Sequence, residues 1–371
     1  MARNREPGRA YRERLVRLLA KGPDRPSQLG VRSWLRITFR TVAEFIDDDL
    51  ADRAAALTYY SVLSIIPGLL VLVAGVGLFG SKTTAAVAEN ISELTPGPAQ
   101  RAVLDVLNEL RYDQRAAGVA FAIGIGLAFW SATSYTGAFM RAANVIYDVP
   151  EGRPVWKTVP VQLFVTAVTG LTLAASALAV VFTGRVATHA GRALGVEETT
   201  VRVFDIVKWP VLIIVVNLLL ALLYWAGPNA RQAGFRWITP GTMVAMVAWI
   251  AASAGFAYYT TTFDSYNRTY GALGGVIIFL VWLWLTNVAV LLGAEFDAEL
   301  SRARAIAAGL PHDAEPYLPL RDVPRQPVPG QPPVLPEGGP DVIEGDLVDE
   351  GGPVDEVVPV EPDEPAPPAR A

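Results

Sequence analysis

The sequence predicts an all-α polytopic membrane protein with six transmembrane helices, an N-terminal interfacial helix and short external helices. Hydrophobic residues make up 52% of the 371 residues and charged residues only 18%, a more apolar balance than soluble domains show. Six long segments carry no charged residue, and each is close to the roughly 20 residues that a helix needs to cross the hydrocarbon. Helices of this kind have no polar face to turn toward water.

The six predicted spans belong to one membrane domain, which covers residues 57–305. They comprise residues 57–79, 116–137, 159–183, 209–227, 238–260 and 270–294. Tryptophans lie at or near several of their ends, where an indole ring prefers the boundary between hydrocarbon and water. Between the first two spans, apolar stretches flank Pro96, Gly97 and Pro98, a pattern that predicts two short external helices.

The charged residues gather at the two ends of the chain. Residues 1–40 hold eleven basic residues against three acidic ones, so residues 1–30 are predicted to be a basic arm that stays in the cytoplasm. Six crossings return the C-terminus to the same side. Residues 311–371 hold sixteen prolines and fourteen acidic residues, and residues 306–371 are therefore predicted to be a disordered acidic tail.

Residues 31–56 predict an amphipathic helix on the inner leaflet of the membrane. Trp34, Ile37, Val42, Phe45 and Ile46 recur near one side of a helix, while arginines lie elsewhere on it. The alternative is a solvated N-terminal extension of the first span.

The residues that carry most enzyme chemistry are scarce. The chain has no cysteine and two histidines, which lie far apart in the sequence at His189 and His312, so no histidine pair has metal-ligand spacing. No nucleophile elbow, P-loop or dinucleotide-binding motif is found in its required context. We therefore expect no catalytic residue, no metal and no cofactor, and the chain is predicted not to be an enzyme.

Small and polar residues within the spans leave two interpretations open. Ser61, Ser64, Gly68 and Gly75 lie on one seam of the first span, and Gly118, Ala122 and Gly126 recur at intervals of four in the second. Such seams favour close helix packing in lipid, and the alternative is a polar wall that faces a cavity. Pro67, Asn217 and Asn287 add a helix break and two amides within hydrocarbon.

Several stretches resemble the YihY/BrkB family of bacterial inner-membrane proteins. They read AAALTYYSVLSIIPGLL (54–70), WSATSYTGAFMRAANVIYDVPEGRPVW (130–156), GPNARQAGFRWITPG (227–241) and SYNRTYGALGGVIIFLVWLWLTNVAVLLGAEFDAEL (265–300). The resemblance covers roughly residues 35 to 305 and implies a six-span protein of the inner membrane whose activity is poorly defined. It also implies a link to lipid traffic toward the envelope.

Candidate site residues follow from the span polarity and from the resemblance together. Those expected to line a substrate site or pore are Tyr59, Tyr60, Ser61, Ser64, Pro67, Ser134, Tyr135, Asn217, Asn267, Tyr270 and Asn287. The candidate contacts for a lipid phosphate are Arg141 and Arg236, since a guanidinium can hold a phosphate by two parallel hydrogen bonds.

Three functions compete at this point. The leading one is binding or translocation of a lipid or other amphiphile, with membrane lipids as partners. The runner-up is a non-transporting scaffold for envelope machinery, acting with an envelope protein or as a homo-oligomer. Family members also carry the label ribonuclease BN, but the clustered His and Asp ligands of a metal-dependent nuclease are missing, so no nucleic-acid partner is expected.

Overall fold

The computed structural model describes residues 15–20, 29–78, 114–181, 198–232, 239–262, 272–312 and 314–324. Its long elements are helices: α2 (Val31–Asp47), α3 (Leu50–Leu78), α6 (Gln114–Ile146), α7 (Val155–Val181), α9 (Glu198–Ala226), α10 (Pro240–Thr262) and α12 (Ala272–Ala307). Within these ranges the only β pairing is a single bridge between Ala230 and Leu320. The predicted all-α class is confirmed.

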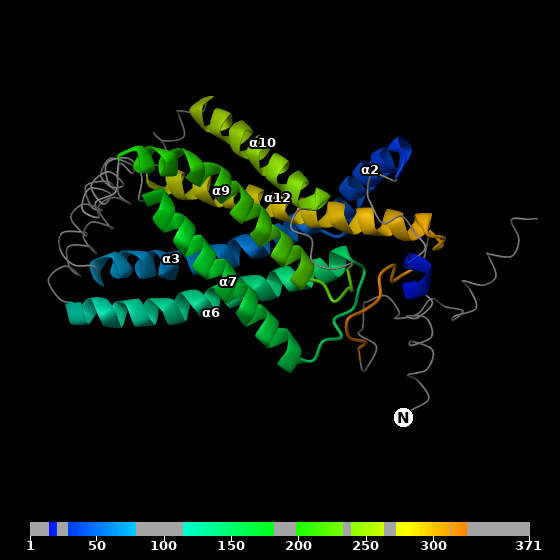
Figure 1. Cartoon of the computed structure of the whole chain (residues 1–371), viewed down its shortest axis with the longest axis horizontal. Coiled ribbons are helices and arrows are strands. Elements are labelled where there is room, and N and C mark those ends of the chain that lie inside the picture. Colours follow the sequence, from blue (N-terminus) through cyan, green and yellow to red (C-terminus); the bar gives the residue numbers. More distant parts are fainter. Residues whose placement is uncertain are drawn as a thin grey trace, which may run out of the picture.

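Three helices form the long axis of the molecule. Figure 1 shows α3, α6 and α12 running along this axis, with contacts between each pair of them. Helices α7 and α9 cross them obliquely, and α10 packs against α12. Helix α2 lies beside the C-terminal half of α12.

Buried side chains gather at one end of the bundle, which we call the core end. Here the last turns of α6 and α9 and the second half of α12 meet the first turns of α3. Phe139 stacks on Tyr224 with ring centroids 6.2 Å apart, and Tyr147 stacks on Tyr317 at 6.5 Å. Both pairs are almost fully buried, so this end resembles the core of a soluble protein.

Away from the core end, large apolar side chains point outward along the helices. Trp130 is 78% exposed, and Leu171, Ile206 and Val247 are likewise exposed on α7, α9 and α10. Apolar surface on this scale needs a hydrocarbon solvent rather than water. Among the described residues, four stretches are long and apolar enough to cross a membrane: Val155–Ala177, Ile206–Ala226, Pro240–Thr260 and Gly274–Ala307.

The first two predicted spans, 57–79 and 116–137, fall on α3 and α6, which have 29 and 33 residues. Residues 79–113, which include nearly all of the predicted external helices, lie outside the described residues.

Helix α2 is shorter than the predicted interfacial helix, and a different face is exposed. It ends at Asp47, and Asp49 adopts a left-handed conformation with φ of 52° before α3 begins. Residues 50–56 therefore belong to α3 rather than to the predicted 31–56 helix. Trp34 stacks on Phe296 of α12 at 6.1 Å, and Ile37 is buried beside it. The exposed apolar stripe consists of Val31, Leu35, Phe39, Val42 and Ile46.

The first part of the predicted disordered tail is ordered and packed. Residues 306–307 belong to α12, and Tyr317, Leu318 and Leu320 are buried at the core end. The backbone N–H groups of Arg231 and Arg321 donate to the carbonyls of Pro319 and Asn229, at 2.7 and 2.8 Å. The tail as a whole is acidic and proline-rich, but residues 317–320 form a short apolar stretch whose side chains can be buried. Residues 325–371 lie outside the described residues.

Candidate functional site

Polar side chains within the helices bond to one another across helix interfaces. The Tyr135 hydroxyl on α6 donates to Asn287 Oδ1 on α12 at 3.0 Å, and Asn287 Nδ2 donates to Thr58 Oγ1 on α3 at 3.1 Å. Asn287 is 2% exposed. The structure thus brings two of the predicted lining residues together, and their hydrogen bonds join the three long helices.

Asn217 belongs to a separate contact between α9 and α10. Its Nδ2 lies 3.4 Å from the sulfur of Met246, and its Oδ1 accepts from Thr242 Oγ1 at 3.4 Å. Asn217 is 5% exposed, so its amide is used within the helix pair. It does not share a site with Tyr135 and Asn287.

The predicted hydroxyl positions of α3 and α6 mostly bond to their own helices. Ser61, Ser64 and Ser134 each donate to the backbone carbonyl four residues earlier, at 2.9, 2.8 and 3.2 Å. Tyr59 is 61% exposed and meets Tyr60 edge to face, with centroids 5.4 Å apart.

Pro67 lies inside α3, which continues through it from Leu50 to Leu78. The remaining candidates, Arg236, Asn267 and Tyr270, lie outside the described residues.

Three glycines of the predicted seams do not make close contacts. A Cβ on Gly68, Gly118 or Gly126 would meet nothing within 4 Å. The close approach occurs instead between α10 and α12, where a Cβ on Gly241 would lie 2.2 Å from the carbonyl oxygen of Gly293. Spacing alone could not tell which small residues face a neighbouring helix.

Asp297 fixes the start of α10 at this crossing. Its Oδ1 accepts the Gly241 N–H at 2.7 Å, and its Oδ2 accepts the Thr239 hydroxyl at 2.5 Å. A carboxylate in this place satisfies unpaired N–H groups of the first turn and complements the helix dipole.

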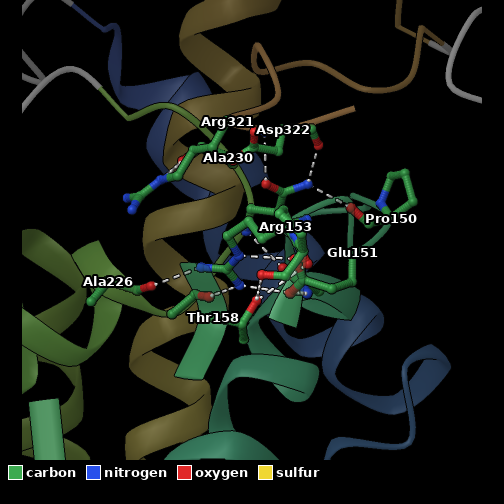
Figure 2. A network of polar contacts seen from close by, with 12 residues as sticks. Pro150, Glu151, Arg153, Thr158, Ala226, Ala230, Arg321 and Asp322 are labelled. Carbon is green, nitrogen blue, oxygen red and sulfur yellow. Dashed lines mark hydrogen bonds and ion pairs between the residues drawn. The ribbon is translucent and has the colours of Figure 1, made fainter. Parts of the chain in front are cut away.

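A buried polar network joins three chain segments at the core end. Figure 2 shows Arg153 and Glu151 of the α6–α7 link between the end of α9 and the C-terminal segment. Arg153 Nε and Nη2 donate to the two carboxylate oxygens of Glu151 at 2.9 and 2.7 Å, and Nη1 and Nη2 also donate to the carbonyls of Ala226 and Gly227 at 3.2 and 2.8 Å. The guanidinium therefore caps the C-terminus of α9.

Asn229 extends the same network to the C-terminal segment. Its Nδ2 donates to the carbonyls of Pro150 and Asp322, both at 2.8 Å, and its backbone N–H donates to Asn144 Oδ1 at 2.7 Å. Burial opposes ionisation of Glu151, but hydrogen bonds from Arg153 and Asn144 outweigh it, so the pKa of Glu151 is lowered. The candidate site residues predicted from the sequence do not include Arg153.

One predicted lipid contact, Arg141, is exposed at the α6–α7 interface. It lies on α6 within the turns that form the core end, and no partner for its guanidinium is found among the described residues. A Cβ on Gly137 would lie 3.1 Å from Gln162 Nε2 of α7 and 3.6 Å from Arg141 Nη1. Two hydrogen-bond donors thus approach one point, and the exposed side chains of Leu163 and Phe164 lie next to Gln162 along α7.

Comparison with known proteins gives the family of the chain. The model of a protein family described as "Virulence factor BrkB" matches residues 41–317. A ribonuclease-like protein, YfkH, of Bacillus subtilis (strain 168) is 27% identical over 265 residues, which is 71% of this chain and 93% of that protein. A UPF0761 membrane protein of Alkalilimnicola ehrlichii is 31% identical over 77% of this chain, and one of Ralstonia nicotianae is 30% identical over 73%.

The chain spans 64% and 59% of the lengths of the last two relatives. No solved structure matches the chain. The family match covers most of the membrane body and reaches into the packed C-terminal segment. The chain is therefore a membrane protein of the BrkB virulence factor family.

Proposed function

We propose that the chain crosses the inner membrane six times, with the core end and both termini on the cytoplasmic side. Four helices have the required length and composition among the described residues, and α3 and α6 supply two more crossings. In this placement α2 lies on the inner leaflet. Its exposed stripe around Phe39 and Val42 enters the lipid, and the exposed Arg32 and Arg36 meet the headgroups.

A spin label tests this placement, because the chain has no cysteine of its own. In Phe39→Cys, a label should be accessible to oxygen dissolved in the bilayer and shielded from a water-soluble relaxation agent. In the control Arg36→Cys, the label should respond mainly to the water-soluble agent. Equal response of both labels to the water-soluble agent would place α2 in water.

The function that the geometry supports best is binding or translocation of an amphiphile that carries an anionic headgroup. The pair formed by the exposed Arg141 and the half-buried Gln162 carries this proposal. It offers hydrogen-bond donors where the apolar helix surface ends, as a phosphate at the inner headgroup level requires. The exposed apolar side chains of α6 and α7 continue from it toward the other end and can contact acyl chains. The ribonuclease-like name of YfkH is not extended to this chain.

Replacing Arg141 by glutamine should weaken binding of an anionic lipid about tenfold, because a charge-assisted hydrogen bond contributes about 1.5–3 kcal/mol. Binding of phosphatidylglycerol to the purified full chain is measured by native mass spectrometry. Transfer of a fluorescent analogue across proteoliposome membranes is measured in parallel. The matched control is Arg231→Gln, which removes another exposed arginine near the core end.

The control should bind and transfer the lipid as the unsubstituted chain does. If neither binding nor transfer by the unsubstituted chain exceeds that of protein-free membranes, the proposed function is wrong. If both exceed it but Arg141→Gln has no effect, the lipid is held elsewhere.

A further inference from the structure

Carboxylates from five segments, one of them the second half of α12 itself, converge at the core end. We call these six residues the acidic cluster: Glu44 of α2, Asp48 of the α2–α3 link, Asp148 of the α6–α7 link, Glu295 and Glu299 of α12, and Glu315 of the C-terminal segment. Their charges act on one another across these segments, which are distant in sequence.

Two arginines neutralise only part of this cluster. Arg40 Nε lies 2.7 Å from Glu299 Oε2, and its Nη2 also pairs with Glu44. Arg302 Nη1 and Nη2 lie 3.4 and 3.6 Å from the carboxylates of Asp148 and Glu315. Ion pairs with these two guanidinium groups therefore account for four of the six carboxyl groups, and the charge of Arg53 acts on a fifth, Asp48.

Glu295 has no such partner. It is 1% exposed, and its Oε2 has no hydrogen-bond partner. The charges that act on it most strongly are those of Asp48, Glu299, Glu44 and Asp148, in that order, and all are carboxylates. An ionised carboxylate at this position would lose its hydration without gaining a donor or a counter-ion. The position needs a bound positive charge.

We propose that Glu295, with the acidic cluster around it, is a proton-binding site at the core end of the bundle. A proton needs no cavity and no further ligands, and it turns the unpartnered oxygen into a neutral acid group. A shared metal ion is less suited, because no group of three or more His, Cys, Asp or Glu side chains in the described part of the chain is placed to hold one.

The carboxyls outside the spans show the same tendency to hold protons. Burial, followed by the charges of Glu315 and Asp48, raises the pKa of Asp148 to about 7. Burial, followed by the charge of Glu44, raises the pKa of Asp48 to about 6. The cluster therefore takes up protons near neutral pH, and its members titrate together rather than one by one.

The groups that face Glu295 set the direction of the effect. The carboxylates of Asp48, Glu299, Glu44 and Asp148 disfavour its ionisation. The basic groups of Arg40, Arg53 and Arg302 act on its neighbours Glu299 and Asp48, and the charge of Glu295 in turn acts on the phenols of Tyr147 and Tyr317.

The protonated cluster stabilises the fold below neutral pH. Because the pKa values of Asp48 and Asp148 are higher in the folded chain than in the unfolded chain, the folded state holds more protons between about pH 4 and about pH 7. Stability from these groups is therefore present at the acidic end of this window and lost as the pH rises through it. The like charges that then appear repel α2 and the α6–α7 link from α12.

Infrared titration of the full chain in lipid nanodiscs tests the site directly. The unsubstituted chain should show a carbonyl band of a protonated carboxyl group near neutral pH that disappears at alkaline pH. Glu295→Gln, which has the shape of the neutral acid, should remove the Glu295 contribution to this band. The control Asp52→Asn, an exposed carboxyl in the first turn of α3, should retain it. An unchanged band in Glu295→Gln would overturn the proposal.

Thermal unfolding provides the second measurement, and Asp148→Asn the second variant. At about pH 8, Glu295→Gln should unfold at a higher temperature than the unsubstituted chain, because it needs no proton. Asp148→Asn removes a negative charge near Glu295, so the remaining carboxyl band should titrate at lower pH. Stabilisation by sodium but not by choline, lost in Glu295→Gln, would show a metal cation in place of the proton. No measurement here requires a lipid substrate, so failure of the amphiphile proposal leaves this test intact.

Discussion

Replacing Arg153 by methionine should lower the free energy of unfolding by about 3 kcal/mol, the lower end of the usual cost of removing one partner from a buried ion pair, because the side chain of Glu151 is 34% exposed. The side chain of Arg153 is 4% exposed, and its removal leaves the carboxylate of Glu151 without its main donor. The carbonyls of Ala226 and Gly227 lose their donors as well. The measurement is reversible unfolding of the full chain in mixed micelles.

The matched control is Lys157→Met, which breaks an ion pair with Asp322 in the same region. Lys157 is 53% exposed in this pair, so the expected loss is at most about 1 kcal/mol. The double variant Glu151→Gln with Arg153→Met should be more stable than Arg153→Met alone, because no charge is then left unpaired. Equal losses in Arg153→Met and Lys157→Met would show that the network in Figure 2 contributes no more than a surface pair.

The effect of Arg153→Met should also depend on pH. In the unsubstituted chain the pKa of Glu151 is lowered, so its stabilising contribution is present above the unfolded pKa and is lost as the pH falls through the folded pKa. Without the Arg153 side chain, the hydrogen bond from Asn144 still opposes the effect of burial on Glu151, but the main opposing interactions are lost, so the pKa of Glu151 rises. The difference in stability between the two chains should therefore be smaller at about pH 4 than at about pH 8.

Helix positions could be predicted from the sequence because the requirements for crossing the hydrocarbon concern only consecutive residues. A span must be long, apolar and hydrogen-bonded within itself, and each predicted span overlaps one helix of the structure. The hydrogen-bond partners of polar side chains cannot be predicted from consecutive residues. Asn287 is predicted from its polarity within a span and Tyr135 from the family resemblance. Their hydrogen bond joins positions 152 residues apart, and nothing in either span indicates the other.

Average composition does not predict which parts of the chain pack at the core end. The acidic, proline-rich C-terminal region includes Leu320, which is buried beside the α9–α10 link, and Tyr317, which is buried against Tyr147. Glu295 is another example, because in the sequence it is only one of several acidic residues that follow the last span. Its importance depends on carboxylates from other segments, such as Asp148, that the fold brings near it.

Replacing Gly293 by alanine should destabilise the bundle by about 3 kcal/mol or more, at or above the upper end of the usual cost of overpacking. A Cβ at this position would lie 2.4 Å from the carbonyl oxygen of Gly241, 2.6 Å from the Cβ of Ala245 and 2.6 Å from the hydroxyl of Tyr224. Two of these neighbours are backbone or a short side chain on α10, so α10 and α12 would have to separate. The free energy of unfolding in mixed micelles measures the loss.

Separation of the two helices would also reach the start of α10. Asp297 accepts hydrogen bonds from Gly241 and Thr239 there, and these cannot persist if the helices move apart. The control on the same helix is Gly275→Ala, whose Cβ would meet nothing within 4 Å. It should be neutral or stabilising by up to about 1 kcal/mol, because alanine favours a helix more than glycine does. If Gly293→Ala lowers the free energy of unfolding no more than Gly275→Ala does, the backbones of α10 and α12 are not in close contact at Gly241 and Gly293.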